Sequence, residues 1–242
     1  MDPLNRTLGS RAEMDLGLRD YMLGTYRWMA MAMGVTGVTA YTVGGMLKTN
    51  VALQQILVSN ALMGLLFIGI VMFGFNFFAK RLATMSKGAL VTALFVFAAF
   101  LGVFASPVAI FYPAAELAKV FFMAVAMFGA LSLFGYSTNS NLGTIGRYAV
   151  AGFFAFVVIS LLGAFIPALR PSGMAGIIMN VIGLGLVAVI TAWETQQLKQ
   201  NYYRVAGMPG MAEKLSIFGA ASLLLAFYNI FILLLQLFAS RD

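Results

Sequence analysis

The amino-acid sequence predicts an all-α integral membrane protein with seven transmembrane helices. Of the 242 residues, 62% are hydrophobic and only 10% are charged, whereas soluble domains hold roughly 45–50% apolar and about 25% charged residues. Long apolar stretches recur between short polar segments, and each is close to the ~20 residues that cross a bilayer as a helix. The mean hydropathy is +0.93. We therefore expect lipid to surround most of a single membrane domain.

The first 27 residues precede the first apolar stretch. Within them, Met14, Leu18, Tyr21 and Met22 recur at helical spacing, and charged residues fall on the other sides of the same wheel. This pattern is typical of an amphipathic helix that lies on a membrane surface. Residues 1–27 are therefore predicted to be a cytoplasmic tail that is either an interfacial helix or disordered.

Seven spans follow, and each must be helical because lipid offers no hydrogen-bond partner to a backbone group. The weakest boundary lies between the third and fourth spans, where Pro107 and Pro113 bracket an apolar stretch with almost no polar linker. This pattern is compatible with either a tight turn or a re-entrant segment. A short C-terminal tail covers residues 239–242. The predicted spans cover residues 28–47, 56–78, 88–110, 117–136, 148–167, 174–193 and 215–238.

The distribution of basic residues predicts the orientation of the chain. Eleven of the 15 Lys and Arg residues lie in the N-terminal tail and in every second connection after it. Because basic residues concentrate on the cytoplasmic side of membrane proteins, this bias places the N-terminus in the cytoplasm. An odd number of spans then places the C-terminus outside. We expect a bacterial inner (plasma) membrane.

Several kinds of chemistry are disfavoured by what the chain lacks. It contains no Cys and no His, which excludes disulfides and thiolate metal sites and removes the commonest general base. The net charge of +7 is explained by topology rather than by nucleic acid. No phosphate-binding loop of the GxxxxGK type occurs. We therefore expect no enzymatic activity, no bound cofactor and no nucleic-acid partner.

Ionisable residues at membrane depth are costly and are the first candidates for function. Here they are Glu116, Lys119 and Glu194. Glu116 and Lys119 are three residues apart at one end of the fourth span, so they are predicted to form an ion pair on one helix face. Glu194 is either a solvated carboxylate beside the interfacial Trp193 or a carboxylate turned into the bundle. In the second case it would bind a cation or gate a pathway.

Polar residues within the apolar spans form a second group of candidates. In a dry interior such side chains more often join helices by hydrogen bonds than line a path. Thr191, Asn180 and Asn229 are the polar residues that we expect to support a site at Glu194. The amides in the spans are Asn60, Asn180, Asn229 and Gln236.

Three motifs resemble the Bax inhibitor-1 family, and together they extend the resemblance from about Tyr21 to Phe238. Residues 128–138 end in Gly-Tyr-Ser-Thr and are followed by Leu142 and Gly146, which is similar to the family's turn after the fourth helix. Residues 191–196, Thr-Ala-Trp-Glu-Thr-Gln, look like the signature that ends its sixth helix. Residues 219–220 and 227–231 look like its final helix.

The resemblance implies a seven-helix fold in which six helices surround a central C-terminal helix, and a calcium leak that responds to pH. In bacterial relatives the implied sensor is a pair of facing aspartates, one ending the sixth helix and one in the seventh. This sequence carries Glu194 at the first position and Ala226 at the second. Because Ala226 cannot bind a proton, the two-carboxylate sensor is lost.

The sequence is compatible with two main functions. A third, secondary transport of a small solute, is less favoured. The first is a calcium or cation leak channel influenced by pH, with weak Ca²⁺ binding at Glu194, since Ca²⁺ prefers several oxygen ligands. The second is a non-conducting regulator that binds other membrane proteins, such as a membrane protease or stress-response partners. The scarcity of polar residues within the spans favours the second, because a pore needs lining groups.

Overall fold

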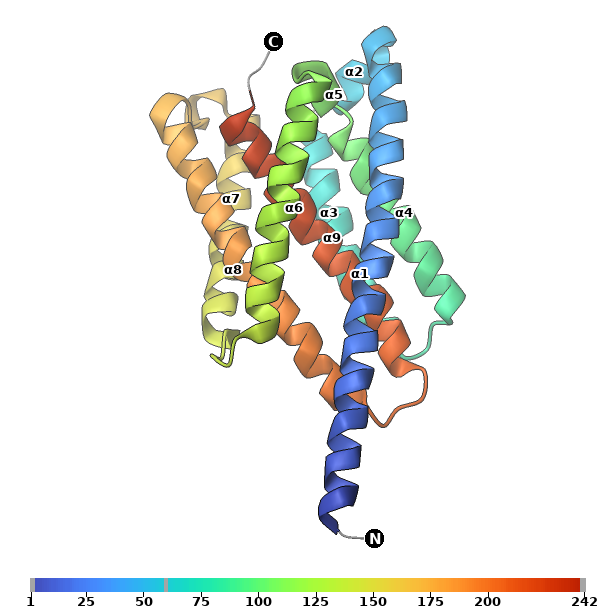
Figure 1. Cartoon of the computed structure of the whole chain (residues 1–242). Helices are drawn as coiled ribbons and strands as arrows, with labels where there is room; N and C mark the ends of the chain where they lie inside the picture. The colour runs from blue at the N-terminus through green and yellow to red at the C-terminus, as the bar shows by residue number, and fades with distance from the viewer. Residues whose placement is uncertain (1–2, 59–60, 240–242) are drawn as a thin grey trace.

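The computed structural model describes residues 3–58 and 61–239, and these residues form helices and no strand (Figure 1). Within them, seven helical segments are long and apolar enough to cross a membrane, which confirms the all-α multi-span class. The long helices are α1 (Pro3–Thr49), α3 (Ala61–Arg81), α4 (Lys87–Ala105), α6 (Ala114–Ser137), α7 (Gly143–Phe165), α8 (Gly173–Val205) and α9 (Met211–Phe238). The short ones are α2 (Val51–Leu57), α5 (Val108–Phe111) and the 3₁₀ helix η1 (Pro167–Leu169).

The connection between the third and fourth spans is a tight helical turn. Helix α4 ends at Ala105 rather than at residue 110, and the single turn α5 separates Pro107 from Pro113. A proline cannot supply the backbone N–H that an uninterrupted helix needs at its position. The turn lies against α1, where a Cβ added at Gly44 would come within 2.8 Å of the Ala109 Cβ. The α4–α5 connection is therefore held against α1 by close packing.

The sequence predicted that residues 1–27 are a tail separate from the first span. Helix α1 instead runs through residue 27 without a break. From Met14 on, where side chains are described, its apolar face contacts the protein. Leu18, Tyr21 and Met22 are buried, and the Tyr21 ring lies 5.4 Å from the ring of Tyr202 in α8. The inner side of this segment therefore packs against the protein, with Tyr21 on Tyr202 of α8, while Met14 at its start is 43% exposed.

Helix α8 continues past residue 193, where its predicted span ended, to Val205. The added turns carry polar residues, so hydropathy alone did not include them. The N-terminal end of α1 and the last turns of α8 lie at one end of the molecule, and the C-terminal end of α9 lies at the other (Figure 1). This arrangement agrees with an odd number of crossings, while the sidedness stays a prediction.

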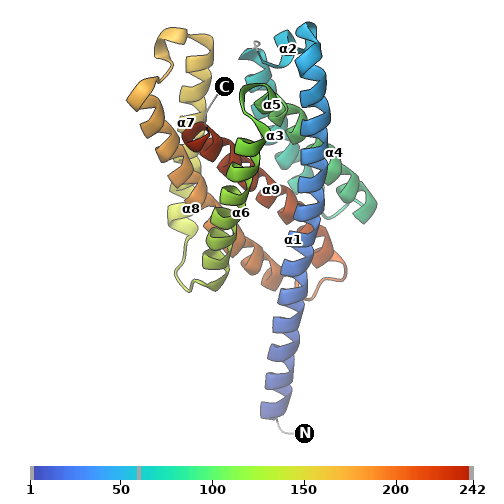
Figure 2. The same ribbon diagram turned by 45° about the horizontal axis from the view of Figure 1, so that its top comes forward.

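Helix α9 is the most deeply buried of the long helices. Over half of its most apolar stretch lies inside the protein, compared with a third or less for each of the others. It runs obliquely through the middle of the bundle (Figures 1 and 2) and packs against α1, α4, α6 and α8. Aromatic rings of α3 also reach it, as in the pair Phe75 and Phe218. That all six other spans surround α9 stays a prediction.

Candidate functional site

Glu194 points from α8 toward α9. The Ser222 hydroxyl of α9 donates a hydrogen bond to Glu194 Oε1 across 3.2 Å. The second carboxylate oxygen, Oε2, is shielded from solvent and makes no hydrogen bond to the described residues. Buried polar atoms nearly always have a partner, so a lone carboxylate oxygen inside a bundle marks a place where a proton or a cation can act.

Small residues bring the neighbouring helices close to this part of α8. A Cβ added at Gly135 in α6 would lie 2.1 Å from the Ala192 carbonyl oxygen, and one added at Gly219 in α9 would lie 2.4 Å from Leu198. Helices with small residues at their contacts approach closely in membranes. Two flanking helices therefore pack tightly against α8, one on each side of the Glu194 position.

Ala226 lies one helical turn after Ser222, so both residues occupy the same face of α9. Ala226 is buried and offers only a methyl group. The partner of Glu194 is therefore a hydroxyl one turn earlier, which the sequence analysis missed. Ser222 could have been predicted from its spacing, because it lies four residues before the family's sensor position, on the same helix face.

A buried group of hydroxyls lies next to Glu194 along α8. Thr195 Oγ1 is 3.4 Å from Ser132 Oγ in α6 and 3.0 Å from the Thr191 carbonyl oxygen of its own helix. The Tyr26 hydroxyl of α1 lies close to both Ser132 and Thr195. Thr191 donates to the Val187 carbonyl of α8 at 2.8 Å. Thr191 thus serves its own helix rather than the carboxylate.

Residues at the end of the 191–196 motif in α8, and just after it, also bind the turn between α6 and α7. Gln196 accepts a hydrogen bond from the Leu142 backbone N–H at 2.9 Å and donates one to the Ser140 carbonyl at 2.8 Å. Lys199 donates to the Tyr136 carbonyl at 3.1 Å, and its ammonium lies 5.2 Å from the centre of the Tyr136 ring. Two of the three family-like motifs therefore meet in space at this turn.

The remaining polar candidates lie elsewhere. Asn180 and Asn229 line a cavity of about 790 Å³ together with Gln236 and Arg170. Asn180 is 14 positions from Glu194 in α8, which corresponds to about 21 Å along the helix. None of these three amides makes a hydrogen bond to the described residues, while Asn60 lies outside them. The predicted site is therefore split into a carboxylate region and a separate polar cavity.

The expected ion pair at the start of α6 is present. Lys119 Nζ lies 3.3 Å from Glu116 Oε2, three residues earlier on the same helix. Lys119 is more than half exposed. This pair is a surface feature and does not belong to the site. Within the residues that the structure describes, no group of three or more His, Cys, Asp or Glu side chains could hold a metal ion.

These features define a multi-spanning membrane protein with seven candidate membrane-spanning helices and a carboxylate at the contact between α8 and α9. The model of the family described as inhibitor of apoptosis-promoting Bax1 matches residues 18–242. The chain therefore belongs to the Bax inhibitor-1 family.

Bacterial relatives are similar over nearly the whole chain. An uncharacterized protein of Rickettsia prowazekii is 32% identical over 97% of this chain and 95% of its own length. An uncharacterized protein of Caulobacter vibrioides is 30% identical over 96% and 93%. The inner membrane protein YbhL of Escherichia coli is 28% identical over 93% of both chains. This similarity supports an inner-membrane location.

Proposed function

We propose that this protein is a cation leak channel influenced by pH, with calcium as the ion and Glu194 as the group that responds. The observation that supports the proposal most directly is the carboxylate itself. Its Oε1 accepts a single hydrogen bond from Ser222, and its Oε2 is buried and makes no hydrogen bond to the described residues. A proton or a cation at Oε2 would change the charge at the contact between α8 and α9.

One carboxylate suits passage better than storage of calcium. Ca²⁺ takes six to eight oxygen ligands in a tight site, and the hydroxyl of Ser222 and nearby carbonyl groups add only weak ones. Conduction requires that an ion bind well enough to enter and weakly enough to leave. The proposal assigns no enzymatic activity to the chain.

The described conformation corresponds to a closed state under this proposal. Between Ser222 and Asn229 of α9 lie the buried apolar residues Leu223, Ala226 and Phe227. Together they separate the carboxylate region from the polar cavity at the other end of the bundle. Opening would require α9 to shift against α8, and the bond between Ser222 and Glu194 joins these two helices.

The test is calcium flux into vesicles that contain the purified protein, measured across a series of pH values. We expect Glu194→Gln to abolish the pH dependence, because an amide cannot take up or release a proton in this range. At one end of the pH series, flux through the variant should differ at least about tenfold from flux through the wild type. This factor corresponds to a shift of ~1.4 kcal/mol in the free-energy difference between the closed and open states.

Glu116→Gln is the matched control, since it makes the same chemical change in an ion pair at the start of α6, where Lys119 is exposed and Glu116 is partly exposed. It should leave both flux and pH dependence unchanged. Flux that is absent from wild-type vesicles, or that responds equally to pH in wild type and Glu194→Gln, would end the proposal.

A non-conducting regulator that binds other membrane proteins is the second candidate. The apolar packing between the two polar regions favours it, as does Ala226 at the position where the family resemblance implies an acid. For this function we expect wild-type vesicles to show no flux and a membrane protein to co-purify in detergent. Flux in vesicles of the purified chain alone would rule it out as the sole function.

A further inference from the structure

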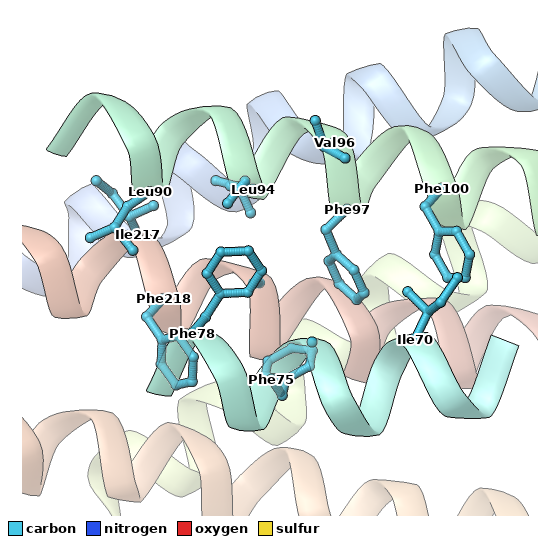
Figure 3. A pocket seen from close by; sticks show the side chains of 13 residues that line it. Ile70, Phe75, Phe78, Leu90, Leu94, Val96, Phe97, Phe100, Ile217 and Phe218 are labelled. Carbon is cyan, nitrogen blue, oxygen red and sulfur yellow. The ribbon is translucent and has the colours of Figure 1, made fainter. Parts of the chain in front are cut away.

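A groove lies between α3, α4 and α9, whereas the carboxylate lies at the contact between α8 and α9. It has a volume of about 270 Å³, and its lining residues are all apolar. Figure 3 shows Phe78 of α3 and Phe97 of α4 pointing into the gap between these helices, with α9 behind them. The groove lies within three candidate membrane spans, so lipid is the medium that it faces.

Helix α3 is held loosely enough to leave this space. None of its described side chains, residues 62–81, is buried, although the helix is as apolar as its neighbours. Aromatic rings make the contacts across the gap, as in Phe75 with Phe97 at 5.3 Å. A Cβ added at Gly74 would meet no atom within 4 Å. The groove therefore has room for an additional apolar group.

The length of the groove matches one leaflet of a membrane. Along α4 it extends from Leu90 to Phe100, which is about 15 Å of helix. The hydrocarbon core of a bilayer is ~30 Å thick, so one leaflet contributes about half of it. An acyl chain entering at the Leu90 end would reach the bilayer midplane near Phe100.

Basic residues gather at the end where such a chain would enter. Lys80 and Arg81 form the last turn of α3 and are exposed, and Lys87 begins α4. Glu213 of α9 pairs with Lys87 at 2.5 Å, and Asp20 of α1 lines the same pocket as these two residues. Lys80 and Arg81 make no ion pair within the described residues. The Arg81 guanidinium lies 4.8 Å from the centre of the Phe77 ring, which does not neutralise its charge, so both cations can attract an anionic headgroup.

We propose that this groove binds one acyl chain of an anionic phospholipid, from the leaflet that faces the α3–α4 connection, with the headgroup at Lys80 and Arg81. The apolar lining and the depth of one leaflet match the chain, and the cations match the phosphate. The proposal is independent of ion conduction. A lipid in this groove would fill the contact that leaves α3 loosely packed.

The experiment uses the full chain in nanodiscs of phosphatidylcholine and phosphatidylglycerol. A phosphatidylglycerol with a photoreactive group in its acyl chain is the probe, and the labelled residues are mapped by mass spectrometry. We expect labelling to concentrate on the groove residues of α3, α4 and α9. Gly74→Leu, which fills the groove, should reduce this labelling about tenfold.

Gly69→Leu is the matched control, because Gly69 is on the same helix, lies outside the groove lining and also has no atom within 4 Å of an added Cβ. It should leave groove labelling intact. Lys80→Gln with Arg81→Gln should remove the preference over a phosphatidylcholine probe. Labelling spread evenly over all lipid-facing helices, or unchanged by Gly74→Leu, would overturn the site. If the phosphatidylglycerol and phosphatidylcholine probes label the groove of the wild-type protein equally, the proposed preference for an anionic headgroup is wrong.

Discussion

Two glycines set how closely α6 and α7 approach α8. Gly135 lies against the Ala192 backbone, and a Cβ added at Gly146 would come within 2.2 Å of the Trp193 ring. Both glycines belong to the motif that resembles the family's turn. At the scale of single residues, this motif therefore acts through close packing, and Glu194 is the residue of the facing signature that offers chemistry.

Gly135→Ala should destabilise the protein although alanine favours a helix more than glycine does. The new methyl group would meet a backbone carbonyl 2.1 Å away, which cannot rotate aside as a side chain does. Overpacking of this kind costs about 1–3 kcal/mol. The measurement is the apparent Tm of the purified protein in detergent.

Gly129→Ala is the comparison for this substitution, because Gly129 is also in α6 but an added Cβ there meets nothing within 4 Å. Its Tm should equal or exceed that of wild type. A Gly135→Ala protein as stable as the Gly129→Ala protein would show that α6 and α8 do not pack as described.

The candidate site could be predicted in part from single residues. Glu194 stood out because an acid next to an apolar stretch is costly, and the structure directs its carboxylate toward Ser222 of α9, with Oε2 shielded from solvent. Ser222 could not be found in the same way, since serines are common in membrane helices and cost little. Asn180 and Asn229 were grouped with Glu194 only because all three are polar, and the structure separates them.

At the scale of elements, Gln196 joins α8 to the turn between α6 and α7. Its amide satisfies one backbone carbonyl, that of Ser140, and one backbone N–H, that of Leu142. Neither group has a partner in a regular helix ladder. This side chain therefore determines how the turn sits on α8, close to Glu194.

Gln196→Ala should lower the apparent Tm, because it leaves two partly buried backbone groups without their partner. Such a loss costs about 1–3 kcal/mol. Gln196→Glu keeps the acceptor for Leu142 but loses the donor to Ser140, so its Tm should fall between those of wild type and Gln196→Ala. Hydrogen exchange at residues 138–142 should rise in the same order.

The neighbouring substitution Gln197→Ala serves as the control. The side chain of Gln197 donates a hydrogen bond to the side chain of Gln200, at 3.3 Å, and none to the turn, so its loss should leave both the Tm and the exchange of the turn unchanged. Equal Tm values for the Gln196→Ala and Gln197→Ala proteins would show that the Gln196 side chain does not hold the turn.

Helix α1 shows the limit of periodicity at this scale. The spacing of Met14, Leu18, Tyr21 and Met22 predicted an apolar face; the last three are buried, and Met14 is 43% exposed. The surface that covers this face could not be predicted, because the acyl-chain boundary of a membrane and the end of α8 are both suitable partners for apolar side chains. Gly17 decided it locally, since only a residue without a Cβ leaves room for the Tyr202 hydroxyl.

At the scale of the whole molecule, the chain suits a direct test of its topology. It contains no native Cys, so a single introduced Cys reports one position. We expect Ser140→Cys, in the α6–α7 connection, to react with a membrane-impermeant maleimide only from the cytoplasmic side. Ser172→Cys, before α8, should react only from outside.

Both positions are exposed, so a difference in labelling reflects sidedness rather than burial. The measurement is labelling of intact cells compared with labelling of opened membranes. If Ser140→Cys reacts in intact cells and Ser172→Cys does not, the orientation is reversed and the basic residues do not set it.

The sequence by itself determined the class of fold, the number of long apolar helices, the absence of Cys and His chemistry and Glu194 as a candidate acid at the end of an apolar span. These properties are local: lipid forces each apolar stretch into a helix, and residue identity limits the available chemistry. Only the tertiary structure decided that Ser222 is the partner of Glu194, that Asn180 and Asn229 line a separate cavity, and that a groove opens beside α3. These depend on close packing between segments far apart in the chain, which hydropathy does not encode because most faces of these helices are equally apolar.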